Sequence, residues 1–351
     1  MNGGGGIERV ISILANNLVK DIGIHVVALN NVGEHFYYLL DGRVNRHLYR
    51  SAGINIFTDY FLKVFYLAKL FRKEKIRIVI SCDIIQNIYC IPATFLSLNA
   101  SLFSWDHFSC YETLGVKWMS KMRVFSSWFS KKYICLTLKD YRYYKNKDFF
   151  YSKNLYQLYN ATPDFDITPT KYDERENLII TAGHLLPIKG YCYLVEVANI
   201  ILKKHPDWKW VICGEGIERN NIENKIVEYK LEDKLILTGR ISDIATYYNR
   251  SSIYVMTSLS EGFPMTLLEA QYFGLPLVSF DINSGPSEII IEEKNGFLIP
   301  PFDINKMADV LDLLINKPNE RKRLSNNSLT FSSNFTIGKI ISLFKENILC
   351  N

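Results

Sequence analysis

The chain has 351 residues, of which 48% are apolar and 22% are charged, and its net charge at pH 7 is +5. This composition is typical of a globular protein of about two domains and excludes an intrinsically disordered chain. The cysteines are odd in number and show no C-x-x-C spacing, so the sequence indicates neither a disulfide framework nor a zinc site.

The chain begins with a glycine run at positions 3–6 that leads directly into a predicted helix over Ile7–Lys20. A glycine-rich turn that binds a ligand normally follows a strand, because the strand fixes the direction of the turn's amides. No strand precedes this run. We therefore expect either that the first strand of the N-terminal domain is absent or that the glycines form a flexible terminus.

Short apolar runs alternate with helical patterns along the whole chain, which favours parallel sheets built from βαβ units. In the first half we predict strands at Ile24–Leu29, Phe36–Leu40, Arg77–Ser81, Ser101–Ser104, Tyr133–Leu136 and Leu155–Tyr159. In the second half we predict them at Leu178–Ala182, Trp208–Cys213, Leu235–Thr238, Ile253–Met256, Leu277–Phe280 and Phe297–Ile299. The two halves therefore repeat one architecture without repeating a sequence.

Residues 117–147 are strongly basic, and aromatic residues are interleaved with the charges. The segment contains a single acid, Asp140. Its basic residues are Lys117, Lys121, Arg123, Lys131, Lys132, Lys139, Arg142, Lys145 and Lys147. A basic, aromatic surface suits the headgroup layer of an anionic membrane. A solvated helix face is the ordinary alternative. Nucleic-acid binding is a further use of such a surface, but no nucleic-acid motif accompanies it, so we expect no nucleic-acid partner.

The segment 160–170 contains two prolines and no periodicity, so it is the predicted linker between two doubly wound domains that face a cleft. Residues 1–163 would form the first domain and residues 164–335 the second. Ligands are expected at the carboxyl ends of strands that face the cleft. Asp164 and Asp166 form an Asp-x-Asp pair, but in a linker this pair indicates a turn and not a metal site.

The most informative motif is the stretch from Glu261 to Glu269. Gly262 and Pro264 keep Glu261 on a loop, whereas Glu269 should lie about one turn inside the helix that follows. The backbone N–H groups of Met265, Thr266 and Leu267 would be unpaired donors at the helix start, where phosphate groups are commonly bound. Two acids beside such a pocket suit a nucleotide sugar, and an ordinary helix start is the alternative.

Several motifs in a fixed order are similar to those of the retaining, GT-B-fold glycosyltransferases of group 1, family four, a large family that includes bacterial polysaccharide-assembly enzymes. They are GGGGIERV (3–10), SWDHF (104–108), AGHLLPIKG (182–190), VICGEG (211–216), LTGRISDI (237–244), SLSEGFPMTLLEA (258–270) and SGPSEII (284–290). The resemblance spans nearly the whole chain and implies two Rossmann-like domains. It also implies that residues 336–351 form a helix that crosses back to the first domain.

The resemblance implies a catalytic role for three residues. Glu261 would bind hydroxyls of the donor sugar, and Lys189 would neutralise the leaving diphosphate. His107, at the carboxyl end of a strand, would approach the reacting centre, although a structural histidine is the alternative. Glu269 would bind the ribose. The segment from Gly262 through Phe263, Pro264, Met265 and Thr266 to Leu267 would hold sugar oxygens and the diphosphate.

Other contacts to the donor follow from the same similarity. Arg240 and Ile241 would meet the nucleobase, and Gly214 would form a close-approach turn. His184 occupies a position where the family usually has arginine, so phosphate binding would depend more on Lys189 and on backbone amides. Gly5 and Gly6 would line the acceptor and phosphate side of the cleft.

The implied reaction transfers a hexosyl or N-acetylhexosaminyl group, with retention, from a UDP-sugar to a lipid-linked oligosaccharide in bacterial surface polysaccharide biosynthesis of the O-antigen or capsule type. No metal or other cofactor is expected. The sequence has no apolar run of about eighteen residues and no secretion signal, so the enzyme is expected in the cytoplasm, peripheral to the inner face of the plasma membrane. A catalytically silent nucleotide-sugar-binding subunit and a GT-B-like nucleotide-sugar epimerase are the alternatives.

Overall fold

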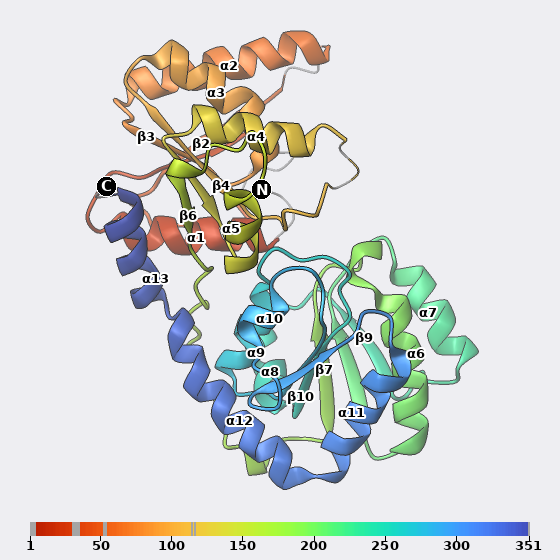
Figure 1. The fold of residues 1–351 in the computed structure, drawn as a ribbon. Coiled ribbons are helices and arrows are strands. Elements are labelled where there is room, and N and C mark those ends of the chain that lie inside the picture. Colours follow the sequence, from red (N-terminus) through yellow and green to blue (C-terminus); the bar gives the residue numbers. More distant parts are fainter. Residues whose placement is uncertain (1–4, 30–35, 52–54, 114, 116, 350–351) are drawn as a thin grey trace. The chain divides into compact units, whose positions relative to one another are not determined.

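The computed structural model describes residues 5–29, 36–51, 55–113, 115 and 117–349. The chain divides into two compact units (Figure 1). The first consists of the residues up to Ala161 together with those from Ile337 onward, and the second runs from Thr162 to Thr336. The sequence placed these boundaries at 163 and 336. Both units are α/β structures with parallel strands, as the alternating pattern predicts.

The first unit contains a parallel sheet and a separate pair of strands. The sheet has the order β3-β4-β5-β6, and among the described residues β1 and β2 form a separate two-stranded sheet. The strands are β1 (His25–Ala28), β2 (Asn45–Leu48), β3 (Ile78–Ser81), β4 (Ser101–Asp106), β5 (Lys132–Cys135) and β6 (Leu155–Gln157). The helices are α1 (Gly6–Leu18), α2 (Ile56–Lys73), α3 (Asn87–Ser97), α4 (Met119–Phe129), α5 (Leu138–Lys145) and α13 (Ile337–Phe344).

The strand predicted at Phe36–Leu40 is wrong, because residues 36–40 contain no strand and the chain forms β2 at Asn45–Leu48 instead. The residues of β2 are mostly polar and lie partly or fully exposed, so they lack the apolar signal of a strand. In the part of the chain that the structure describes, β2 pairs with β1 alone, so backbone hydrogen bonds and not apolar burial define the strand. The expected absence of a strand before the glycine run concerns positions that lie outside the described residues.

The second unit is built on one six-stranded parallel sheet of order β12-β11-β10-β7-β8-β9. The strands are β7 (Leu178–Ala182), β8 (Lys209–Cys213), β9 (Leu235–Gly239), β10 (Ile253–Met256), β11 (Leu277–Phe280) and β12 (Gly296–Ile299). The helices are α6 (Tyr191–Lys204), α7 (Arg219–Glu228), α8 (Ile244–Arg250), α9 (Met265–Tyr272), α10 (Pro286–Ile289), α11 (Ile304–Asn316) and α12 (Pro318–Ser332).

The strand order of the second unit creates a switch point. From β7 the chain proceeds outward through β8 and β9, and then returns to the other side of β7 to form β10, β11 and β12. In such doubly wound sheets, ligands bind outside the carboxyl ends of the strands where the order reverses. The carboxyl ends of β7 and β10 are therefore the expected position for a ligand.

The C-terminal segment packs on the first unit. Phe344 of α13 is fully buried, and its ring centroid lies 5.8 Å from that of Trp105 in β4. A turn of π-helix follows over Lys345–Leu349, where the Asn347 carbonyl accepts a hydrogen bond of 2.8 Å from the buried Lys132. Because these contacts bury apolar surface and a lysine together, the segment is an integral part of the first unit.

No helix in the described part of the chain is both long enough and apolar enough to cross a bilayer.

Candidate functional site

The site begins with an ion pair at the switch point of the second unit. The Lys189 Nζ atom lies 2.6 Å from the Glu261 Oε1 atom. Lys189 ends the turn that follows β7, and Glu261 lies in the loop that follows β10. Since β7 and β10 are neighbouring parallel strands, their carboxyl ends bring together two residues that are 72 positions apart. Both side chains are partly exposed, so a ligand can reach them.

Backbone contacts hold this ion pair in position. The Leu259 amide donates a hydrogen bond of 2.8 Å to the Ile188 carbonyl, and the Thr257 hydroxyl donates one of 3.2 Å to the Lys189 carbonyl. Gly190 follows with φ +64°, and a Cβ atom at that position would collide with the Thr257 carbonyl oxygen. The glycine in IKG is therefore required by the close approach of two loops.

The Glu261 carboxylate has a second partner that the sequence did not identify. The Ser258 hydroxyl donates a hydrogen bond of 2.7 Å to the same Oε1 atom that pairs with Lys189. Ser258 lies three residues before Glu261 in the motif SLSEG, and this short spacing is the signal that a sequence reading could have used. Lysine and serine together fix the carboxylate orientation at one oxygen and leave the other for a ligand.

The remaining positions predicted at this edge lie on the turns after β7, β8 and β9. A Cβ atom at Gly214 would collide with the Gly183 carbonyl, and the Gly183 amide donates to the Cys213 carbonyl at 3.0 Å. Gly214 is therefore explained by backbone packing between two turns. His184 is partly buried, Ile241 is partly buried and Arg240 is exposed. The carboxyl end of the sheet therefore carries Lys189 and Glu261 together with all of these positions, namely His184, Gly214, Arg240 and Ile241.

The helix predicted after Pro264 is α9, which begins at Met265, and Glu269 lies one turn inside it. The Leu267 amide donates to the Pro264 carbonyl at 3.2 Å, so its expected availability to a phosphate is wrong. The amides of Met265 and Thr266 precede this first helical hydrogen bond. Leu267 is already paired because the Pro264 carbonyl accepts the bond that starts the helix.

Glu269 is almost fully buried, with 3% of its surface exposed. The Tyr248 hydroxyl donates a hydrogen bond of 3.0 Å to the Glu269 Oε2 atom.

The turn before α9 is tightly packed, since a Cβ atom at Gly285 would lie 2.8 Å from Pro264 Cδ and 2.9 Å from the Gly262 carbonyl oxygen. Phe263 is buried and contacts Phe335 at 5.5 Å between ring centroids. This packing gives the turn at 262–264 a defined shape.

In the first unit, His107 follows β4 directly, at the carboxyl end of a strand as predicted. Only 6% of its surface is exposed, and its ring packs against Trp105 with 4.8 Å between centroids. Burial lowers the pKa of the imidazole to about 3, so the ring is neutral at physiological pH. The Nε2 atom is buried without a protein hydrogen-bond partner. A buried polar atom normally has a partner, so this one is suited to contact a ligand.

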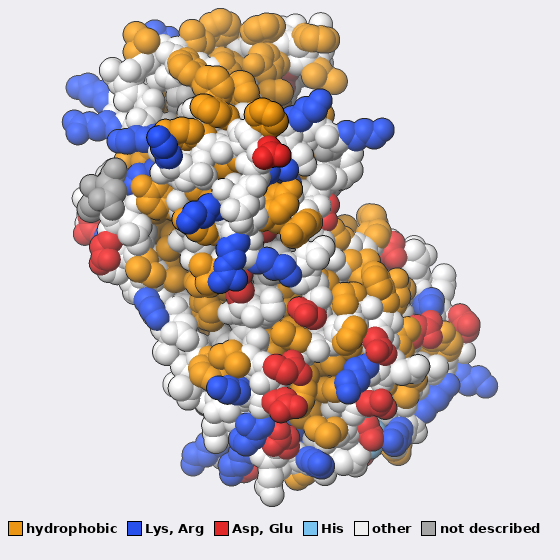
Figure 2. All heavy atoms as spheres, viewed as in Figure 1, with side chains coloured by type: hydrophobic (Ala, Val, Ile, Leu, Met, Phe, Trp, Pro, Cys, Tyr) orange, Lys and Arg blue, Asp and Glu red, His pale blue; other side chains and the backbone are white. Residues whose placement is uncertain are grey.

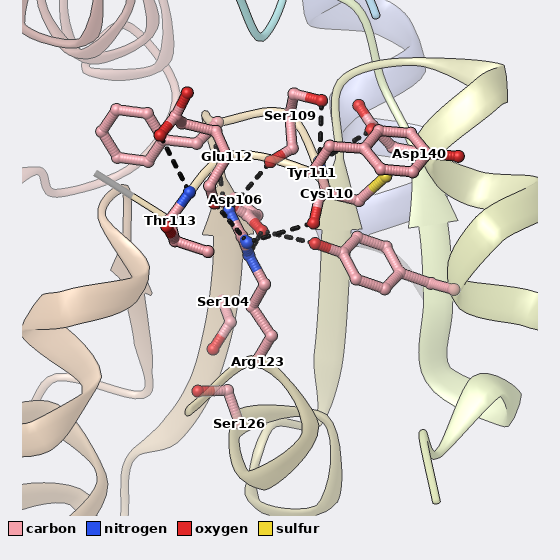
Figure 3. Close-up of polar contacts among 12 residues, drawn as sticks. Ser104, Asp106, Ser109, Cys110, Tyr111, Glu112, Thr113, Arg123, Ser126 and Asp140 are labelled. Carbon is pink, nitrogen blue, oxygen red and sulfur yellow. Dashed lines mark hydrogen bonds and ion pairs between the residues drawn. The ribbon is translucent and has the colours of Figure 1, made fainter. Parts of the chain in front are cut away.

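The loop that carries His107 is fixed by a buried arginine on α4 (Figure 3). The Arg123 Nε atom lies 2.8 Å from the Asp106 Oδ2 atom, and both side chains are almost completely inaccessible to water. The arginine also donates to three loop carbonyls, those of Ser109 at 3.0 Å, Cys110 at 3.3 Å and Glu112 at 2.6 Å. One guanidinium group therefore organises the backbone on the C-terminal side of His107.

Asp106 is the centre of the same network. In addition to Arg123, its Oδ2 atom accepts hydrogen bonds from the hydroxyls of Tyr133 at 3.0 Å and Tyr144 at 2.9 Å. Burial and the Asp106 charge raise the pKa of both tyrosines, so they remain donors. Asp106 thus helps to hold the loop that carries His107 in position. Its other carboxylate oxygen, Oδ1, accepts a hydrogen bond of 3.2 Å from the Phe108 amide.

The basic strip predicted at 117–147 needs correction. Arg123 and Lys132 are buried, with 1% and 2% of their surfaces exposed, because one binds Asp106 and the other binds the C-terminal segment. Neither is available to a membrane. Lys139, Arg142 and Lys147, in contrast, line an open surface hollow of about 520 Å³ together with Tyr111, Tyr143, Asn146 and Asp148. The hollow adjoins the His107 loop through Tyr111, and its excess of cations favours an anionic group.

Gly5 and Gly6 lie at the start of α1, where Gly5 is the N-cap and Gly6 is the first helical residue. Gly5 has an extended backbone with φ −79°, so its conformation does not itself require glycine. These two residues and His107 belong to the first unit, and all other predicted site residues belong to the second. Among the described residues, no cluster of three or more His, Cys, Asp or Glu side chains is arranged to hold a metal ion.

Comparison with known proteins gives the family. The model of glycosyl transferases group 1 matches residues 164–330. An uncharacterised glycosyltransferase of Haemophilus influenzae is 30% identical over 344 residues, which cover 97% of this chain and 95% of that protein. The GalNAc-α-(1→4)-GalNAc-α-(1→3)-diNAcBac-PP-undecaprenol α-1,4-N-acetyl-D-galactosaminyltransferase of Campylobacter jejuni is 28% identical over 341 residues, which cover 96% of this chain and 92% of that protein.

A solved structure supports the fold independently of sequence. HepE of Anabaena, in complex with UDP and glucose, is 15% identical and superposes with a TM-score of 0.83 over 100% of this chain and 98% of that one. The fold is therefore GT-B, with two Rossmann-like units. Together with the family match and the full-length relative, this shows that the chain belongs to the group 1 glycosyltransferases, GT-B-fold enzymes of bacterial polysaccharide assembly.

Proposed function

We propose that this glycosyltransferase transfers a hexosyl or N-acetylhexosaminyl group from a UDP-sugar, with retention of anomeric configuration. The observation that carries the proposal is the Lys189–Glu261 ion pair at the switch point of the second unit. An ammonium group suits a diphosphate whose charge grows as it leaves. A carboxylate can accept hydrogen bonds from two vicinal sugar hydroxyls. The pair thus offers the carboxylate for the sugar and the ammonium group for the diphosphate, the two parts of the donor that separate when the glycosidic bond breaks.

The neutral His107 suits a role at the sugar and not at the phosphate. A ring that is uncharged at pH 7 cannot neutralise a diphosphate, but its buried Nε2 atom can form a hydrogen bond with a sugar hydroxyl. No strong base is needed if the departing phosphate oxygen takes the acceptor proton on the same face of the sugar. Catalysis then depends on positioning and on stabilising the leaving group, and no metal is required.

The acceptor that we propose is a lipid-linked oligosaccharide at the inner face of the plasma membrane. The Campylobacter relative is named for an undecaprenol diphosphate-linked glycan acceptor. The hollow beside the His107 loop supports a similar acceptor here, because Lys139, Arg142 and Lys147 can pair with a diphosphate. An enzyme that uses such an acceptor would work in the cytoplasm on a membrane surface, in the biosynthesis of an O-antigen or capsule type of glycan.

A panel of nucleotide sugars tests the proposal. Each donor is incubated with lipid-linked acceptors, and the product is scored by mass and by the anomeric coupling constant in NMR. We expect transfer from a UDP-sugar, an α product from an α donor, and an unchanged rate in the presence of EDTA. An inverted product or a chelator-sensitive rate would contradict the mechanism.

Two variants and a matched control connect the activity to the site. Glu261→Gln removes the charge that pairs with Lys189 and should abolish most transfer. Glu176→Gln makes the same chemical change in the exposed ion pair with Arg250, elsewhere on the second unit, and should leave transfer unchanged. Equal activity of the two variants would remove Glu261 from the site. Donor binding without any transfer by the unaltered protein would instead indicate a silent nucleotide-sugar-binding subunit.

A further inference from the structure

The first unit exposes an unusual number of large aromatic side chains on three helices. They are Phe57, Phe61 and Phe65 of α2, Phe95 of α3, and Phe125 and Phe129 of α4, with between 42% and 80% of each residue exposed. We call this set the phenylalanine face. Isolated exposed apolar residues are normal in soluble proteins, but contiguous ones usually mark a surface that contacts something else.

The members of the phenylalanine face form two groups that lie on packed helices. Phe57, Phe61 and Phe65 are four residues apart and share one stripe of α2. α2 packs against α3, and the Phe95 ring of α3 lies 5.7 Å from that of Phe129. Phe129 in turn lies 4.4 Å from Phe125. In Figure 2, hydrophobic side chains crowd the surface over α2 and α3, with Lys and Arg side chains at the edges of the crowded area.

The phenylalanine face is not needed for the core of the unit. The core side of α2 is formed by Val64, Leu67, Ala68 and Phe71, which cluster with buried residues of α3 and β4. α2 is therefore apolar on its outer side as well as on its inner side. A surface helix of a globular protein normally has a polar outer side, so the outer phenylalanines need an explanation other than folding.

The fully exposed charges near the phenylalanine face are cationic. Over residues 55–100 and on α4, the exposed ionisable side chains are Lys69, Arg72, Lys73, Lys75, Arg77 and Lys121. The carboxylates of the same stretches are partly buried: Asp59 pairs with Lys63, Glu74 pairs with Lys73, and Asp83 accepts a hydrogen bond from the Ile85 amide. The surface therefore combines exposed aromatic rings with a rim in which lysines and arginines predominate.

We propose that the phenylalanine face docks on a bilayer that contains anionic lipids. The rings would enter the layer between headgroups and acyl chains, while the lysines and arginines at the rim contact lipid phosphates. The inference rests on the proposed function, because a lipid-linked acceptor presents its glycan in that same layer. It also moves the membrane contact from the predicted strip at 117–147, of which only the α4 part remains, to α2, α3 and α4.

A second copy of the chain is the competing occupant, and the charges oppose it. In a two-fold symmetric dimer the same surface is present on both subunits, so the cationic rim of one copy would face the cationic rim of the other. An anionic bilayer supplies the complementary charge. Aromatic side chains are also the residues that prefer the interface between water and lipid.

Vesicle flotation tests the inference. We expect the unaltered protein to float with vesicles of phosphatidylcholine and phosphatidylglycerol, to float weakly with phosphatidylcholine alone, and to be partly released by 0.5 M salt. Two double variants should each lower the bound fraction at least about tenfold. One combines Phe61→Ser with Phe65→Ser, and the other combines Lys69→Glu with Lys73→Glu. The matched control replaces Ile217 and Val227, which are 75% and 59% exposed on the second unit, with serine. The control should bind as the unaltered protein does.

Three outcomes would overturn the inference. The first is failure of the unaltered protein to float with anionic vesicles, and the second is equal binding by the phenylalanine variant. The third is a concentration-dependent dimer in analytical ultracentrifugation that the phenylalanine variant abolishes, since it would assign the face to a second copy. Transfer to a short-chain, water-soluble acceptor separates this inference from the proposed function. If the unaltered protein transfers sugar to this acceptor but does not float with anionic vesicles, only the membrane contact is rejected. If it floats but transfers no sugar, the membrane contact is supported and only the proposed function is rejected.

Discussion

At the scale of single residues, the proposed function depends on the ion pair between Lys189 and Glu261 in the second unit. The lysine ammonium and the carboxylate are 2.6 Å apart, so each offsets the charge of the other. A diphosphate and a sugar hydroxyl would have to compete with this pairing. The two residues should therefore act as a coupled unit in binding and catalysis.

A double-mutant cycle tests this coupling. We expect Lys189→Met and Glu261→Gln each to lower kcat/KM by about 10²- to 10³-fold, because in the proposed mechanism each removes a group that contacts the reacting part of the donor. The double variant should lose much less than the product of the two effects, since residues that act as a unit are not additive. Steady-state kinetics with a saturating acceptor measure all four proteins. Strictly multiplicative losses would show that the two groups act independently.

His107 should contribute to the pH dependence of stability. Its pKa is about 3 in the folded protein, against an ordinary value near 6.5, because burial disfavours the charged ring. Between these values the unfolded chain binds a proton that the native protein excludes, so the free energy of unfolding decreases as the pH falls. From pH 7 to pH 5 this effect is about 2 kcal/mol.

Urea unfolding of the unaltered protein and of His107→Gln at several pH values provides the measurement. The variant has no group at position 107 that can take up this proton. As the pH falls from 7 to 5, the free energy of unfolding should therefore decrease more in the unaltered protein than in the variant. Carboxylates titrate in both proteins and cancel in the difference. Parallel stability curves would show that the pKa of His107 is the same in the native and unfolded states.

At the scale of elements, α4 supports the loop after β4 through one side chain. Arg123 joins the Asp106 carboxylate to the carbonyls of Ser109, Cys110 and Glu112 (Figure 3). A lysine would keep the ion pair but has no planar fork with which to reach three carbonyls at once. The position therefore requires arginine and not merely a positive charge.

Arg123→Lys should leave the fold intact and loosen the loop at 107–113. We expect faster hydrogen exchange of the loop amides and a kcat about 10- to 100-fold lower, because His107 is no longer held in one position. Arg123→Ala should instead destabilise the first unit by about 3–5 kcal/mol, since it leaves the buried Asp106 charge unpaired. Lys121→Ala, on the exposed side of the same helix, is the control. Unchanged exchange in the lysine variant would show that the loop does not depend on Arg123.

At the scale of the whole molecule, the chain returns to its first unit after completing the second. The C-terminal segment buries Ile340, Ile341, Phe344 and Ile348, and its Asn347 carbonyl binds the buried Lys132. Phe344 contacts Trp105, two residues before His107. Residues 340–348 therefore support the strand that precedes a candidate catalytic residue.

Phe344→Ala should destabilise the first unit alone. Removing a fully buried phenylalanine typically costs about 3–5 kcal/mol, because it loses apolar burial and leaves a cavity. Hydrogen-exchange mass spectrometry should show lost protection in β4, β5 and α1 and unchanged protection in β7–β12. Leu314→Ala, at a fully buried position of α11, should produce the reverse pattern. Equal loss of protection in both units would show that the two units unfold as one.

The sequence predicted most of the elements, because helices and buried strands depend on short-range periodicity. The strands at Leu178–Ala182, Ile253–Met256 and Leu277–Phe280 have the predicted bounds. The loop position of Glu261 and the helical position of Glu269 followed from Gly262 and Pro264 alone, since these residues restrict the backbone locally. The strand at Asn45–Leu48 was missed because its pairing with β1 leaves no apolar pattern in the sequence.

By itself, the sequence determined the fold class, the family and the residue types at the carboxyl ends of the strands. Only the tertiary structure decided which of those residues meet. Lys189 and Glu261 pair because β7 and β10 are neighbours in the sheet, and strand order is set by long-range packing that no local pattern records. The same reason explains the charges at 117–147. Whether a lysine or arginine faces water or binds a buried partner, as Arg123 and Lys132 do, depends on what the rest of the chain places beside it.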